Sequence, residues 1–110
     1  MDNIGKWQIV IEDRWHYLAK LLNLDGEVIL QSETYSALSG VKSGIETIKK
    51  NIENDNFALS VDKFGKYFFK LYSSSTRLLC VSNTFQDLQT CKKTIEQVKK
   101  FYKSPITVNS

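Results

Sequence analysis

Apolar and polar residues alternate near the beginning of the chain. In the segment WQIVIE, Trp7, Ile9 and Ile11 fall on one side of an extended backbone, a pattern typical of a half-buried β-strand. The segment HYLAKLL, residues 16–22, alternates in the same way. Two consecutive strands are therefore predicted before residue 23.

After the second strand, the sequence predicts a turn and a third strand. The spacing of the apolar residues then changes. The Asp25-Gly26 pair predicts a hairpin turn, because both residues tolerate a positive φ angle. The third strand is expected to run through Val28 and Leu30. The apolar spacing then becomes three or four residues, which indicates an amphipathic helix. Its predicted apolar stripe consists of Leu38, Val41, Ile45, Ile48 and Ile52.

The second half of the chain carries the same succession of patterns. The apolar stripe of its predicted helix consists of Leu88, Cys91, Ile95, Val98 and Tyr102. Thr84 and Asp87 have capping-box spacing near the start of that helix. Pro105 should end it, because the residue before a proline avoids helical geometry. Short strands are predicted after the two helices, over residues 57–61 and 106–108.

The two halves match without a gap when the chain is shifted by fifty residues. Identical pairs include Tyr17 with Tyr67, Ser32 with Ser82, Ile45 with Ile95, and Glu46 with Glu96. An ungapped match of this length predicts an internal duplication within one domain, 1–110, with repeats over about residues 5–54 and 55–110. The predicted fold class is α+β, with tandem β-β-β-α-β repeats in one mainly antiparallel sheet. Both helices are expected on one face, with pseudo-twofold symmetry and exchange of the terminal strands.

The first half also resembles a known family. Its segments G-K-x-x-I, G-x-x-I-L-x-S-E-x-Y and G-I-x-x-x-K-x-N are similar to the signature of the YegP-like family of small, mostly bacterial, tandem-repeat proteins. The matching positions are Gly5, Lys6, Ile9, Gly26, Ile29, Leu30, Ser32, Glu33, Tyr35, Gly44, Ile45, Lys49 and Asn51. The resemblance covers almost the whole chain, clearly in the first half and weakly in the second. It implies two β-β-β-α-β units sharing one sheet, and it implies no activity, because the family is uncharacterised.

The second half departs from that signature at two glycines. Thr76 and Thr94 stand where the first half has Gly26 and Gly44. Loss of the first glycine should relax the hairpin turn. Loss of the second places a side chain where the family lets the helix approach the sheet closely.

Composition narrows the class of protein. With 110 residues, 42% hydrophobic and 25% charged, the chain is expected to be one globular domain rather than a disordered one. No apolar run is long enough to cross a bilayer and no secretion signal is visible, so a cytoplasmic protein with free thiols is expected. The sequence contains no phosphate loop and no acid–base or metal-ligand constellation, so we expect no enzyme activity, cofactor or metal.

Three potentially reactive residues have simple structural interpretations. His16 is the only histidine and has no evident catalytic partner, so it is predicted to be a surface residue at a strand edge. Cys80 and Cys91 correspond to the apolar Leu30 and Val41 of the first half. Both cysteines are therefore predicted to be buried and inert. The alternative, a redox-sensing pair, requires at least one exposed thiolate.

The net charge of +3 conceals two halves of opposite sign. Residues 1–55 carry six basic and nine acidic side chains, whereas residues 56–110 carry nine basic and three acidic ones. A cluster of basic residues on the predicted second helix comprises Lys92, Lys93, Lys99, Lys100 and Lys103. Such a face favours nucleic acid or another polyanion. The alternative is an ordinary solvated helix face.

Large apolar residues also fall on the sheet face expected to lie away from the helices. They are Leu18, Leu22, Phe68 and Tyr72. An exposed apolar patch there would mark an interface with a second copy, as a homodimer, or with a partner protein, whereas scattered apolar residues require no function. The leading interpretation is a non-enzymatic interaction module that uses this open sheet face. The alternative is weak, sequence-tolerant nucleic-acid binding through the second helix.

Overall fold

A computed structural model describes residues 5–109 of the chain. The elements, in chain order, are β1 (Lys6–Asp13), β2 (His16–Leu22), β3 (Val28–Ser32), α1 (Leu38–Glu53), β4 (Phe57–Val61), β5 (Tyr67–Tyr72), β6 (Leu78–Val81), α2 (Leu88–Phe101) and β7 (Ile106–Asn109). The fold is α+β, with a mostly antiparallel sheet and two helices, as the sequence predicts.

The seven strands form a single sheet in the order β4-β5-β6-β3-β2-β1-β7. Neighbouring strands are antiparallel except for β1 and β7, which are parallel. The centre of the sheet is the β3–β6 pair, where Gln31 lies opposite Val81 and Ser32 opposite Cys80. β4 and β7 are consequently the two edge strands of the part of the chain that the structure describes.

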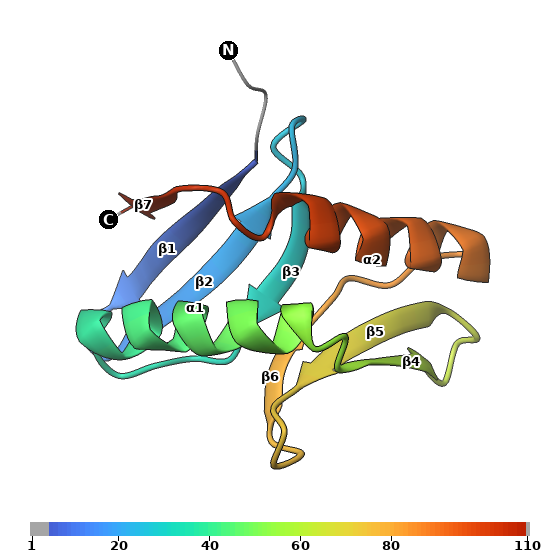
Figure 1. The fold of residues 1–110 in the computed structure, drawn as a ribbon, viewed down its shortest axis with the longest axis horizontal. Coiled ribbons are helices and arrows are strands. Elements are labelled where there is room, and N and C mark those ends of the chain that lie inside the picture. The colour runs from blue at the N-terminus through green and yellow to red at the C-terminus, as the bar shows by residue number, and fades with distance from the viewer. Residues whose placement is uncertain (1–4, 110) are drawn as a thin grey trace.

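Both helices lie across the same face of the sheet, as Figure 1 shows. The core is the layer between them and the strands. Trp7, Ile9 and Leu21 are fully buried there against the apolar side of the helices, which includes Val41 and Val98. The spacing of three and four thus matches most of both buried stripes, as an amphipathic helix on a sheet requires. The assignment of Leu88 to the buried stripe of the second helix is wrong, because this residue at the start of α2 is 37% exposed.

Strands β3 and β6 each contain an irregularity that the alternation rule does not predict. Leu21 lies opposite Leu30 but Leu22 lies opposite Val28, so Ile29 is an extra residue in β3. Ile29 and Leu30 both belong to the buried core, while Val28 is only half-buried. A β-bulge therefore shifts the alternation of β3 by one residue.

The hairpin that follows β5 keeps the turn geometry of the hairpin that follows β2. Gly26 has a φ of 80° and its N–H donates to the carbonyl of Asn23. Thr76 has a φ of 66° and its N–H donates in the same way to the carbonyl of Ser73. The expectation of a relaxed turn at Thr76 is wrong. The hydrogen bonds of the loop hold a β-branched residue in the left-handed region that favours glycine.

The two helices begin differently. The carboxylate of Asp87 accepts a hydrogen bond of 2.7 Å from the N–H of Thr90 and caps α2. Asp87 is thus the N-cap itself, and the predicted capping box with Thr84 is wrong. Ala37 occupies the N-cap of α1 and provides no side-chain hydrogen bond. At its other end α2 stops at Phe101, which is buried in place of the predicted Tyr102.

Candidate interaction edge at strand β4

The sheet face away from the helices does not carry the exposed apolar patch expected from the sequence. Leu18 is only 4% exposed and Leu22 only 8% exposed, while Phe68 and Tyr72 are half-buried. The exposure expected of Leu18 and Leu22 is wrong because β2 is an interior strand. Cross-strand neighbours, including Val10 opposite Leu18, cover its side chains on both sides.

The exposed apolar side chains of the sheet lie instead at its edges. Leu59 and Val61 of β4 are 45% and 57% exposed. At the other end of the sheet, Ile9 of β1 is fully buried and Ile11 is half-buried. These residues precede Leu59 and Val61 by fifty positions, so equivalent sequence positions have opposite environments.

The difference follows from β7, which covers the outer edge of β1. Ile106 lies beside Trp7, and Val108 lies beside Ile9 in a parallel register. The N–H of Trp7 donates to the carbonyl of Pro105 at 2.9 Å. Within residues 5–109, no strand pairs with the outer edge of β4. Leu59 is consequently exposed where Ile9 is covered.

The backbone of β4 is oriented to accept another strand. The carbonyl of Asn56 accepts a hydrogen bond from Tyr72, and the N–H of Asp62 donates to Lys66, so both groups point toward β5. Because antiparallel pairing alternates along a strand, the backbone groups of Phe57, Leu59 and Val61 point away from β5. These groups line the open edge of the sheet.

A groove of about 430 Å³ runs between this edge and α2. Its apolar lining comes from Phe57 and Leu59 on β4 and from Ile95 on α2. Lys92, Lys93 and Lys99 of α2 form its basic side. The charge pattern of the sequence singles out these three lysines, but it does not place them beside an open strand, because the end of a sheet is a property of strand order.

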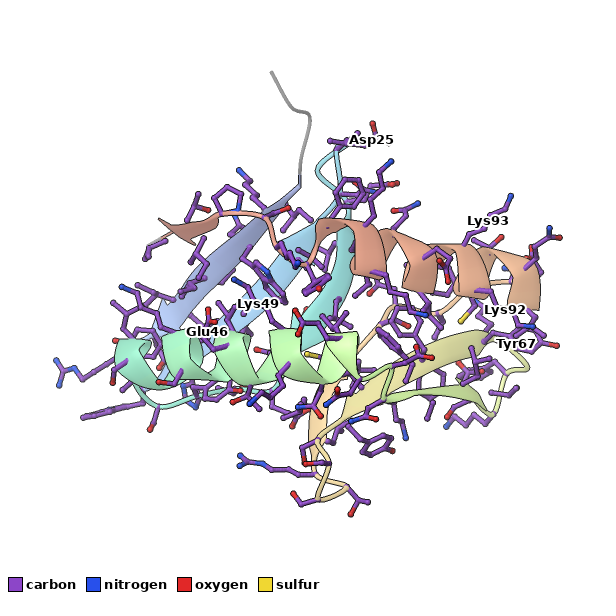
Figure 2. All side chains as sticks on the ribbon, in the orientation of Figure 1. Asp25, Glu46, Lys49, Tyr67, Lys92 and Lys93 are labelled. Carbon is purple, nitrogen blue, oxygen red and sulfur yellow. The ribbon has the colours of Figure 1, made fainter. Side chains whose placement is uncertain are left out.

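The three lysines of the groove differ in their ion pairing. The ammonium group of Lys99 lies 2.9 Å from the carboxylate of Asp55 and 3.8 Å from that of Glu96. The hydrogen bond that Lys99 donates to the carboxylate of Asp55 raises the pKa of Lys99 above its ordinary value. Among the described residues, the ion pairs include Lys99 but neither Lys92 nor Lys93. Figure 2 shows these two lysines on the half of α2 that runs beside the β4–β5 hairpin.

The other two lysines of the predicted cluster lie elsewhere. Lys100 borders a separate hollow with Asn23 and Asp25 of the first hairpin. Lys103 follows the helix, with its ammonium group 5.7 Å from the centre of the Tyr102 ring. The structure therefore does not gather the five lysines into one patch.

His16 and the cysteines have the environments predicted for them. His16 is exposed, and its Nδ1 lies 2.7 Å from the carboxylate of Asp13 in the β1–β2 turn. Cys80 and Cys91 are fully buried and carry free thiols, and burial raises the pKa of both. Among residues 5–109 there is no group of three or more His, Cys, Asp or Glu side chains that could hold a metal ion. No helix in that part of the chain has the length and apolarity needed to cross a membrane.

Comparisons with known proteins agree with this architecture. A family model described as "Domain of unknown function (DUF1508)" matches residues 16–57. A UPF0339 protein of Acinetobacter baylyi is 33% identical over 76 residues, covering 68% of each chain. A UPF0339 protein of Photorhabdus laumondii is 26% identical over 98 residues, covering 88% of this chain and 86% of its own.

Two solved structures share the fold. The yegP protein of E. coli, described as of unknown function, has a TM-score of 0.89 at 20% identity and matches 99% of this chain and 96% of its own. A UPF0339 protein of Shewanella oneidensis has a TM-score of 0.86 at 25% identity, with 94% and 90% coverage. The protein is of the class of small α+β proteins in which a seven-stranded, mostly antiparallel sheet carries two helices. Within that class, the chain belongs to the UPF0339 family of YegP-like proteins, whose function is not established.

Proposed function

We propose that the protein is a non-catalytic protein-interaction module that binds partners at the outer edge of β4 and in the adjoining groove against α2. The observation that carries the proposal is the 45% exposure of Leu59, at a position whose counterpart Ile9 is fully buried under β7. An apolar edge strand with unpaired backbone groups is a template for strand addition.

The proposal includes an internal duplication of the chain. The N–H of Ala19 donates to the hydroxyl of Ser32, and fifty residues later the N–H of Phe69 donates to that of Ser82. Tyr17 forms an isolated bridge with Tyr35. Tyr67 forms the same bridge with Phe85. Shared local geometry at a constant offset supports two units of common origin related by a pseudo-twofold axis at the β3–β6 pair.

The duplication supplies a reason for the open edge. Each unit would contain three strands, a helix and a following strand. The strand that follows α2 is β7, which covers the edge of the first unit. The strand that follows α1 is β4, which already serves as the first strand of the second unit. Within residues 5–109, the second unit therefore has no further strand that covers β4.

Self-association through the same edge is a second version of this function. If two copies paired β4 with β4 about a twofold axis, the two strands would be antiparallel and both α2 helices would lie on the same face of the joined sheets. Because Lys99 contacts Asp55 just before β4, Lys92 and Lys93 lie toward the other end of that strand. The lysines of the two copies would therefore lie toward opposite ends of the junction.

A display library of random peptides tests the proposed function. We expect selected peptides to bind the wild-type protein and to lose binding to Leu59→Pro, since proline removes the outward N–H of residue 59. Trp15→Ala removes an apolar side chain that is 63% exposed in the turn between β1 and β2, so it serves as the control and should retain binding. Peptides that bind both variants equally, or the absence of any selected peptide, would contradict the proposal.

Nucleic-acid binding through α2 is the second candidate. The exposure of Lys92 and Lys93, which form no ion pair with another residue of the range 5–109, supports it. Phosphate binding should be strongest at low salt, because it releases condensed counterions. A gel-shift titration with arbitrary DNA and RNA at low and at physiological salt tests it. A complex that forms at low salt and weakens in Lys92→Glu/Lys93→Glu would favour this candidate. Absence of a shift at low salt would eliminate it.

A further inference from the structure

We infer that the β4 groove takes an extended segment of a partner protein as a strand parallel to β4, with apolar side chains at two alternate positions followed by an acidic one. This inference rests on the proposed function and adds the orientation, register and chemistry of the partner. Its basis is the way in which the same chain covers the edge of β1.

The pairing of β7 with β1 provides the template. β7 follows Pro105 and runs parallel to β1, with Ile106 and Val108 on the side of the sheet that faces the helices, beside Trp7 and Ile9. The hydroxyl of Thr107 donates to the carbonyl of Trp7 at 3.3 Å. Two β-branched residues separated by one polar residue are thus what this kind of edge receives.

The pairing of β7 with β1 can be applied to β4, because the residues of β4 lie fifty positions after those of β1. An incoming strand would place its first apolar side chain beside Phe57 and its second beside Leu59, the two residues that line the groove from β4. The segment FALSV of β4 contains no proline and no charged residue. Edge strands protected against pairing usually carry such residues, so nothing in the sequence of β4 opposes an added strand.

The direction of α2 locates the acidic position. Lys99 contacts Asp55, which lies just before β4, so the later part of α2 is close to the start of that strand. Lys92 and Lys93 lie about two helical turns earlier, about 10 Å along the helix, toward the end of β4. A partner residue beside Val61 would therefore approach these lysines, and a carboxylate there would complement their charge.

Synthetic heptapeptides that copy the sequence around β7 are the probes. SPITVNE has isoleucine, valine and glutamate at the three inferred positions, and SPITVNK differs only in its last charge. We expect SPITVNE to bind more tightly by about tenfold, the effect of one favourable charge contact against one repulsive one. Lys92→Glu/Lys93→Glu should reverse this preference. Lys100→Glu/Lys103→Glu makes the same change of net charge outside the groove and should leave the preference unchanged.

Backbone methylation of the peptide tests the register without altering the protein. In parallel pairing, a residue of one strand bonds to the residues before and after its neighbour, and the bond from Trp7 to Pro105 sets which residues of β7 face β1. Methylation of the peptide threonine nitrogen should abolish binding, whereas methylation of the valine nitrogen, which points away, should be tolerated. Equal tolerance of both methylations would overturn the inference.

Amide hydrogen exchange measured by NMR identifies the edge that is used. Saturating SPITVNE should slow the exchange of the Phe57 and Leu59 amides by about tenfold or more, since they gain acceptors. The Ala58 and Ser60 amides, which face β5, should not change. Slowed exchange or shifts confined to Trp7 and Ile9 would mean that the peptide displaces β7, which contradicts the inference.

A nitroxide at the C-terminal end of the peptide reports its direction. Parallel binding should broaden the amide signals of Val61 and Lys92, and antiparallel binding those of Asp55 and Asn56. The antiparallel outcome, or library peptides that require β4 but lack the acidic position, would overturn the inferred partner while leaving the proposed function intact. Failure of all library peptides to require β4 would overturn both.

Discussion

The phenol ring of Tyr35 lies against the backbone of Gly44 on α1, so closely that its hydroxyl oxygen and Cζ would overlap a β-carbon at residue 44. Fifty residues later, Phe85 stands in place of the tyrosine and Thr94 in place of the glycine. Thr94 is buried, and its hydroxyl donates to the carbonyl of Thr90. The second half thus has a smaller ring where it has a larger helix residue.

We predict that Gly44→Ala lowers the free energy of unfolding by about 1–2 kcal/mol, because overpacking outweighs the better helix propensity of alanine. Gly40→Ala is the matched control in the same helix. Its β-carbon would meet the Tyr35 ring at an ordinary 3.7 Å, so it should leave stability unchanged or raise it by about 0.5 kcal/mol. Urea denaturation of both variants makes the comparison. Equal effects of the two substitutions would contradict this prediction, because they would show that the Tyr35 ring moves aside at little cost.

A capping residue at position 37 should stabilise α1. Ala37 supplies no side-chain acceptor, whereas Asp87 does so at the equivalent place of α2. Ala37→Asp should raise the free energy of unfolding by about 1 kcal/mol, the usual effect of a good N-cap. Ala37→Asn carries an uncharged acceptor and should retain most of the gain. Thermal denaturation would measure the change, and no gain from either variant would count against the geometry of this helix start.

The contribution of Asp87 should depend on pH. The backbone N–H of Thr90 holds the pKa of Asp87 below its usual range. A carboxyl whose pKa is lower in the folded state stabilises the fold above its unfolded pKa, and this effect is lost as the pH falls through the folded value. The stability difference between wild type and Asp87→Asn should therefore shrink below about pH 4. Melting temperatures measured between pH 2 and pH 7 would show it, and a constant difference would disagree.

The positive φ of Thr76 predicts an easy stabilisation. Thr76→Gly should raise the free energy of unfolding by about 0.5–1 kcal/mol, because glycine adopts the left-handed region without the steric penalty of a branched side chain. The reciprocal change, Gly26→Thr, should cost a similar amount. A β-carbon at residue 26 would meet no atom within 4 Å, so its cost would be purely conformational. Thr76→Ala separates loss of the hydroxyl from relief of the backbone.

The two cysteines should be unreactive in the folded protein. Cys80 and Cys91 are fully buried, and burial raises the pKa of both thiols. An aromatic disulfide reagent at pH 8 should label neither thiol while the protein remains folded. It should label both thiols rapidly once guanidinium has unfolded the protein. Rapid labelling of one thiol under native conditions would revive the redox-sensing interpretation.

Much of the fold was predictable because local patterns agree with it. The alternation through Trp7 and Ile9 and the helical spacing of Val41 and Ile45 each follow from burying one side of an element. The burial of Cys80 and Cys91 could be inferred from their apolar counterparts. The bulge at Ile29 could not, since VIL is equally compatible with regular alternation, and only pairing with β2 shows the extra residue.

The interaction site was predictable only in part. Lys92, Lys93 and Lys99 could be selected from charge alone, but Leu18 and Leu22 were assigned to an exposed face that neighbouring strands cover. Leu59 and Val61 were missed, because their sequence pattern matches that of the buried Ile9 and the half-buried Ile11.

The amino-acid sequence by itself determined the strands, the helices and the buried side of both helices, since these depend on residues close together in the chain, and it also showed the fifty-residue correspondence. Only the tertiary structure decided which strands end the sheet. That outcome depends on β7 pairing with β1 across about a hundred residues. The exposure of a strand depends on whether another strand lies beside it. The sequence of β4 alone therefore does not reveal that its outer edge is open.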